Sequence, residues 1–210
     1  VRIADYYANH GDGVYSGLNR FNNYDFRYGA RFASWPALLF LSVYEGTGDP
    51  YYLNASRIIM DRVMEKQLWS GGWLEDTFTD GYCYCKDKKC KGSATFMIGL
   101  IMHAMEEYRR IAEDDMVAPG IVGAALYLME NTYAGNGFFR ITTCPTVRSG
   151  VPDHICAGLA SAYYLSGNEE IREALMLGAL RTPSFQLGKS LSAYMHFVTG
   201  TLKLLDESYR

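Results

Sequence analysis

The segment from His10 to Arg31 holds the densest group of side chains that could do chemistry. Uronate chemistry needs such a set, because a cation must neutralise the sugar carboxylate while a base removes the proton next to it. Arginine offers a bidentate match to that carboxylate. In the alternative interpretation the aspartates cap turns and the arginines pair with them. We predict catalytic roles for His10, Asp12, Tyr15 and Asp25, and substrate-binding roles for Arg20, Tyr24, Arg27 and Arg31.

Two later segments add candidates. Glu75 and Asp76 are predicted as one half of an acid/base pair, with Asp25 or Asp153 as the other half. The nearby aromatic residues would form a wall on which a sugar ring stacks, or a tryptophan plug over the helix ends. Asp153 and His154 open a helix whose N-terminal dipole favours an anion. The further predicted substrate-binding residues are Trp35, Trp73, Tyr82, Tyr84, Arg140, Asp153 and His154.

Five cysteines admit three interpretations. A disulfide between Cys85 and Cys90 would close a charged turn, and a second from Cys83 to Cys144 would join two loops; both need an oxidising compartment. The same four residues could hold zinc, although their spacing is not the usual C-x2-C. They could also be free thiols. Cys156 is predicted to be a small buried residue.

The elements that must position these residues follow one repeated pattern. A helical run, a tight turn ending in Asp or Asn and a second helical run occur three times. Ser34 is a candidate N-cap with Pro36 in the first turn, and His103 is predicted to be a structural helix residue. The predicted helices are 34–44 and 51–67, 94–110 and 117–129, and 155–165 and 171–181, with an unpaired run at 190–205. The predicted apolar stripes are Leu38, Leu39, Ser42 and Val43, and Met97, Ile98, Ile101 and Met102.

The connections are of two kinds. Those inside a hairpin are short, whereas those between hairpins are long: the segment before Arg31, then 70–92, then 134–151. Alternate connections of stacked hairpins fall on opposite faces, so we expect the long ones on one face. Long ordered loops in compact domains are usually functional. Short strands within them are compatible with the sequence.

The alternation of helices and short turns resembles the (α/α) toroid of carbohydrate-active enzymes. The sequence VYEGTGDPYYL at 43–53 carries this resemblance. The stretch before it resembles the YetA-like, exo-acting rhamnogalacturonan lyases in His10-Gly11-Asp12, Asn22-Asn23-Tyr24-Asp25 and Gly29. This resemblance implies an all-α fold of helical-hairpin repeats in a partial or complete toroid, with about seven helices. A complete ring needs six hairpins, whereas the sequence shows three and a half. Either a longer chain has been trimmed, or the ring is an open arc, or further domains or subunits complete it.

Composition and charge narrow the classes of function and location to be expected. A net charge of −3 gives no reason to expect nucleic-acid binding, and no apolar run reaches the roughly 18 residues of a membrane span. We interpret Val1 as a processed or trimmed N-terminus. The sequon Asn54-Ala55-Ser56 and the cysteines suit an extracellular, periplasmic or cell-surface location.

We therefore expect a single domain over 1–210 that acts on polysaccharide or oligosaccharide without a cofactor. The first hypothesis is a polysaccharide lyase or glycoside hydrolase of acidic, uronate-containing sugars. The second is a non-catalytic structural or sugar-binding module of a larger surface protein. A terpene-cyclase-like or prenyltransferase-like toroid would need a clustered Asp-rich helix motif, and the sequence has none.

Overall fold

Three helical hairpins and a small sheet make up the computed structural model, which describes residues 4, 31–73, 94–144, 149–150 and 155–181. This confirms the all-α prediction at the level of fold class, and the run at 190–205 lies outside the described residues. The helices are α3 Arg31–Thr47, α4 Pro50–Lys66, α6 Thr95–Ala112, the 3-10 turn η2 Asp115–Val117, α7 Ala118–Asn131, α8 Cys156–Ser166 and α9 Glu169–Arg181. The antiparallel strands are β1 Tyr133–Gly135, β2 Phe138–Arg140 and β3 Ser149–Gly150, in the order β1-β2-β3.

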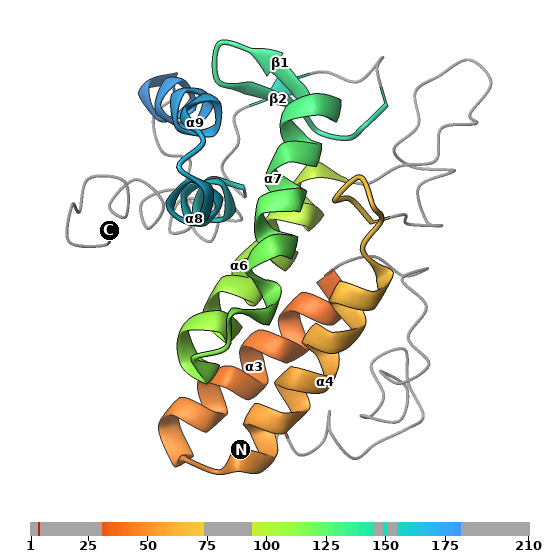
Figure 1. The fold of residues 1–210 in the computed structure, drawn as a ribbon, viewed down its shortest axis with the longest axis vertical. Helices are drawn as coiled ribbons and strands as arrows, with labels where there is room; N and C mark the ends of the chain where they lie inside the picture. The colour runs from red at the N-terminus through yellow and green to blue at the C-terminus, as the bar shows by residue number, and fades with distance from the viewer. Residues whose placement is uncertain (1–3, 5–30, 74–93, 145–148, 151–154, 182–210) are drawn as a thin grey trace.

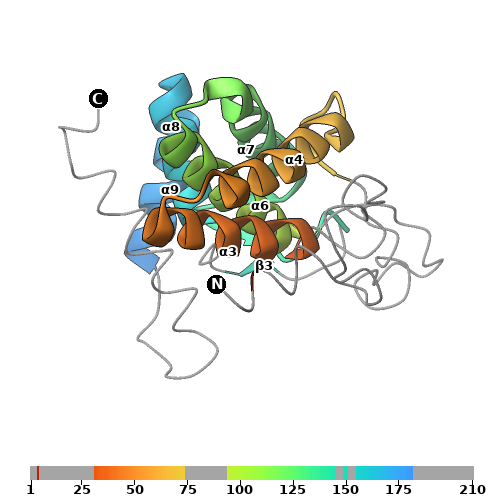
Figure 2. The same ribbon diagram turned by 90° about the horizontal axis from the view of Figure 1, so that it is seen from below.

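Helix α6 lies at the centre of the core. It packs against α3 on one side and against α7 and α8 on the other (Figures 1 and 2). The predicted stripe of Met97, Ile98, Ile101 and Met102 is fully buried, as expected. The first helices of the three hairpins, α3, α6 and α8, are consecutive neighbours, and each second helix packs against its own partner.

The apolar stripe predicted for the first helix is confirmed only in part, because Leu38, Leu39 and Val43 are partly buried and pack against the core, whereas Ser42 does not. Ser42 is exposed and its hydroxyl donates to the Leu38 carbonyl oxygen at 2.9 Å, whereas Ala37, Phe40 and Leu41 are the buried residues. Helix α3 also begins three residues before Ser34, which is buried inside it. Proline removes only one N–H donor, so the apolar contacts of this face can hold a helix through Pro36.

The three short turns share one backbone design. In the first, Gly48 adopts the left-handed conformation, and the Asp49 carboxylate then accepts a hydrogen bond from Tyr51 N–H at 3.0 Å. In the third, Gly167 is left-handed, and the Asn168 side chain accepts from Glu170 N–H at 2.9 Å. In each of these turns a left-handed residue therefore ends one helix, and the side chain that follows caps the start of the next helix.

The second turn uses the same design without a glycine. Glu113 takes the left-handed conformation at φ 51°, and Asp114 accepts from Met116 N–H at 3.0 Å. The Tyr108 hydroxyl also donates to Asp114 Oδ2 at 3.1 Å. Burial and this hydrogen bond raise the pKa of Tyr108 to about 12, so the hydroxyl remains a donor at neutral pH.

The short and long connections separate as expected for the first two hairpins. Their short turns lie at the lower end of Figure 1, and the described parts of the long connections lie at the upper end. Arg110 Nη2 donates to Glu45 Oε1 at 3.0 Å, which joins the two lower ends. The α8–α9 pair crosses the other helices and is seen nearly end-on in Figure 1, so the third hairpin does not continue their direction.

Replacing Glu113 by glycine should stabilise the protein by about 0.5–1 kcal/mol, because an L-residue with a side chain is strained in the left-handed region. Urea denaturation monitored by circular dichroism measures the change. Gly48→Ala is the matched opposite substitution, because it puts a side chain on a left-handed residue. Gly48 has φ 69° with open space around it, so this variant should destabilise the protein by a similar amount. A neutral or destabilising Glu113→Gly would contradict the assignment of strain to this turn.

Candidate functional site

Most of the residues predicted to form the site lie outside the described part of the chain, so their roles stay predictions. Arg31 begins α3, but its side chain is also outside that part. The predicted disulfide and metal residues of the second long loop share this status. The predicted residues that lie outside are His10, Asp12, Tyr15, Arg20, Tyr24, Asp25, Arg27, Glu75, Asp76, Tyr82, Tyr84, Cys83, Cys85, Cys90, Asp153 and His154.

The two described tryptophans that we predicted as sugar contacts differ in exposure. Trp73 is 1% exposed, and its indole N–H donates to the Val63 carbonyl oxygen at 2.9 Å. This ring seals the end of α4 and offers no face to a sugar, which corrects its predicted role and agrees with the plug alternative. Trp35 is 51% exposed on α3, and its binding role stays a prediction.

Arg140 is held within the third long connection. Its Nη2 donates to the carbonyl oxygen of Asn131 at the end of α7, and its Nε is buried without a hydrogen-bond partner. Strand alternation places its side chain on the face of β2 opposite Phe139. Arg140 therefore ties the sheet to α7, and its predicted contact with substrate stays a prediction.

The cysteines and the sequon are partly described. Cys156 is fully buried in the core, which confirms its prediction, and Cys144 is buried as well. Among the described residues, no group of three or more His, Cys, Asp or Glu side chains could hold a metal ion. Asn54 is exposed on α4, while the Ser56 hydroxyl is buried and donates to the Ala37 carbonyl oxygen at 3.1 Å.

An open groove of about 740 Å³ is lined by residues from the end of α7, the β1–β2 hairpin and α9. Its volume falls in the range of small-molecule sites. The helical spacing of i, i+3 and i+4 brings the lining residues of α7 onto one face, and the same spacing does so on α9. The lining residues are Leu126, Met129 and Glu130 of α7, Tyr133 and Asn136 of the hairpin, and Glu170, Glu173, Ala174 and Leu177 of α9.

Tyr133 is fixed in place at this groove. Its hydroxyl oxygen accepts a hydrogen bond from Gly137 N–H at 3.2 Å. Its ring packs on Phe139, with ring centroids 5.0 Å apart and planes tilted by 46°. The side chain is only partly buried, so part of its aromatic surface is accessible. Because the ring is already fixed, binding a ligand would not cost the entropy of ordering this side chain.

The hairpin that carries Tyr133 is itself docked on α9. Asn136 and Gly137 both have positive φ, at 55° and 78°, as a two-residue hairpin turn of type I′ requires. A Cβ on Gly137 would lie 2.2 Å from the backbone nitrogen of Gly178, so the turn touches the helix backbone directly. This contact fixes one end of the groove.

The charged side chains that line the groove are three exposed carboxylates, Glu130, Glu170 and Glu173. They make no ion pair with a described residue. Glutamates elsewhere in the described part, such as Glu65 and Glu107, do have ion-pair partners. Within the described part of the chain, the groove therefore carries negative charge without a paired cation, between apolar residues of α7 and α9.

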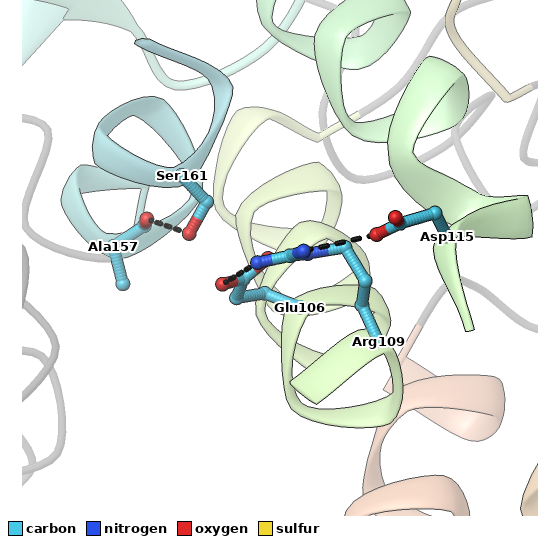
Figure 3. A network of polar contacts seen from close by, with 5 residues as sticks. All are labelled: Glu106, Arg109, Asp115, Ala157 and Ser161. Atoms are coloured by element: carbon cyan, nitrogen blue, oxygen red, sulfur yellow. Dashed lines mark hydrogen bonds and ion pairs between the residues drawn. The ribbon is translucent and has the colours of Figure 1, made fainter. Parts of the chain in front are cut away.

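A second cluster, around buried Glu106, has a structural role. Arg109 binds the Glu106 carboxylate through Nε at 2.9 Å and Nη2 at 3.1 Å, and reaches Asp115 through Nη1 at 3.0 Å (Figure 3). These bonds, first of all the one to Glu106, raise the pKa of Arg109 beyond its usual range. Figure 3 also shows Ser161 of the neighbouring α8, whose hydroxyl donates to the Ala157 carbonyl oxygen at 3.0 Å. The arginine thus neutralises a buried carboxylate and ties α6 to the turn that follows.

Sequence reasoning missed the groove. The pair Asn136-Gly137, flanked by Tyr133 and Phe138, is a strong hairpin signal that could have placed Tyr133 in a strand. Nothing local marks Glu130, Glu170 or Glu173, because glutamates on helices usually form a solvated face.

Comparisons with protein families, with characterised proteins and with solved structures find no match for this chain. Within the described residues, no helix is both long and apolar enough to cross a membrane.

Arg109→Met should destabilise the protein by about 3 kcal/mol, because it leaves the Glu106 carboxylate buried without its arginine. Urea denaturation measures the loss. Arg172→Met is the matched control: Arg172 pairs with Glu169 at the same i, i+3 spacing but in solvent, and its loss should leave the urea midpoint unchanged. If both variants behave alike, Glu106 and Arg109 do not form the structural tie described above.

Proposed function

We propose that this chain is a carbohydrate-binding domain of helical hairpins, and that the groove between α7, the β1–β2 hairpin and α9 is its binding site. The observation that carries the proposal is the fixed aromatic ring of Tyr133 beside side-chain oxygen acceptors. Sugar rings present apolar C–H faces that pack on aromatic rings, while their hydroxyls donate to carboxylate and amide oxygens. Asn136, Glu130 and Glu173 supply such acceptors around Tyr133.

We further propose that the hairpins form part of an (α/α) arc or toroid. The consecutive packing of the first helices α3, α6 and α8 supports this arrangement, since inner helices are neighbours in such folds. Additional domains or subunits would complete a ring. An extracellular or periplasmic location, which would give access to polysaccharide, belongs to the same hypothesis.

The groove favours some sugars over others. Uronates were expected as substrates from the arginines of the first loop, but the described lining of the groove presents three carboxylates and no arginine or lysine. An anionic sugar would be repelled there. A lyase acting on uronates would have to use the predicted residues around His10 and Arg31, so that hypothesis rests on residues outside the groove.

Tyr133→Ala should weaken binding of a neutral oligosaccharide by about tenfold, the scale of one lost aromatic contact. Isothermal titration with β-linked glucose and N-acetylglucosamine oligomers measures the affinity. Tyr133→Phe keeps the ring and should retain most of it. Tyr51→Ala is the control, because Tyr51 is 38% exposed on α4, outside the groove, and should change nothing. Equal affinity of the wild type and Tyr133→Ala would overturn the proposed site.

A glycoside hydrolase is the second candidate, favoured by carboxylates on two different helices that line one groove, Glu130 from α7 and Glu170 and Glu173 from α9. Hydrolysis by a carboxylic acid and a carboxylate needs such a pair across the scissile bond. If the chain is a hydrolase, Glu130→Gln should lower the rate of release of reducing ends at least about 100-fold while neutral oligosaccharides still bind. Binding without any release by the wild type would exclude hydrolysis of the sugars tested.

A further inference from the structure

The groove carries more negative charge than recognition of a neutral sugar requires. Glu130, Glu170 and Glu173 are exposed, and none of them pairs with a cation among the described residues. By contrast, Arg62, Arg110 and Arg172 each pair with a glutamate outside the groove lining. Like charges around one groove repel one another, so a cation bound among them gains more than it would at a single carboxylate.

The aromatic ring points to the same kind of ligand independently of the carboxylates. A cation over the face of a tyrosine is attracted by the ring quadrupole. Tyr133 is held by Gly137 N–H and by Phe139, so its position does not depend on a ligand. An ammonium group close to this ring would be attracted both by the face of the ring and by the carboxylates.

The remaining lining limits the ligand to one with apolar faces. Leu126, Met129 and Leu177 form apolar walls beside the charges, and the groove volume of about 740 Å³ exceeds what a small cation would fill. A bare polyamine would leave Asn136 without a hydroxyl to bind. A pyranose ring with an amino substituent satisfies the walls, the aromatic ring, the amide and the carboxylates together.

We propose that the groove binds amino sugars whose ammonium group is unsubstituted, in preference to their N-acetylated or uronate counterparts. This inference rests on the proposed carbohydrate-binding function and specifies its ligand. The ammonium lies among Glu130, Glu170 and Glu173, and the sugar ring packs on Tyr133. The preference is electrostatic, so it weakens as salt concentration rises and as the amine loses its proton at alkaline pH.

The test is a titration of the full chain with matched oligomers of glucosamine, N-acetylglucosamine and glucuronate, and with spermidine. We expect glucosamine oligomers to bind about tenfold more tightly than N-acetylglucosamine oligomers at low salt, and glucuronate oligomers not to bind. Glu130→Gln and Glu173→Gln should each weaken glucosamine binding by about threefold, and the double variant by about tenfold. The same variants should weaken binding of N-acetylglucosamine oligomers less, because the glutamine amide oxygen still accepts from a sugar hydroxyl but no longer attracts an ammonium group. Glu65→Gln removes the same charge from an exposed site outside the groove and should have no effect.

The outcomes separate the two proposals. Equal affinity for glucosamine and N-acetylglucosamine oligomers, both weakened by Tyr133→Ala, would overturn the amino-sugar preference and leave carbohydrate binding intact. Failure of all three oligomers to bind would overturn both. Spermidine binding as tightly as the glucosamine oligomers would show a general cation site and also overturn the preference. Thermal unfolding of each variant without ligand verifies that the substitutions leave the fold intact.

Discussion

Burial of α6 is the constraint on which the rest of the structure depends. Its apolar residues occupy most of its circumference, so α3, α7 and α8 must all pack against it. Such a helix tolerates a carboxylate only if that charge is neutralised, which is why Glu106 is bound by Arg109 on both oxygens. The same arginine also reaches the exposed Asp115 in the 3-10 turn η2 that precedes α7.

The start of α6 positions the groove as well. Thr95 N–H donates to the Ile141 carbonyl oxygen at 2.9 Å, and the Thr95 hydroxyl donates to the Arg140 carbonyl oxygen at 2.5 Å. The sheet is therefore anchored to the central helix α6, and Tyr133 is carried on a support with little freedom. The crossing of the α8–α9 pair brings α9 alongside the end of α7 and the hairpin (Figure 1). Glu170 and Glu173 of α9 then line the same groove as Glu130 of α7. A binding surface on such a support keeps its geometry without a ligand, which favours recognition.

Charge separates the two parts of the molecule that could meet a sugar. The segment before Arg31 is rich in arginines, on which the uronate hypothesis rests, whereas the described lining of the groove carries glutamates, on which the proposed binding of neutral or cationic sugars rests. The proposed function therefore rests on the groove, whose contacts are defined. The buried cluster around Glu106 has its polar atoms occupied by its own neighbours and serves stability.

The sequence by itself determined the helices and the turns between them. Gly48-Asp49 and Gly167-Asn168 combine a left-handed residue with a capping side chain, both local properties of the chain, so the hairpins could be predicted to within a few residues. Tertiary structure alone decided which stripe of α3 is buried, that Trp73 is a plug, and that Glu130 faces α9. It also decided that Gly137 meets Gly178, since their backbones approach too closely for any side chain. Local signals set φ and ψ over a few residues, whereas the groove depends on how helices far apart in the sequence cross, and that is set by the packing of the whole core.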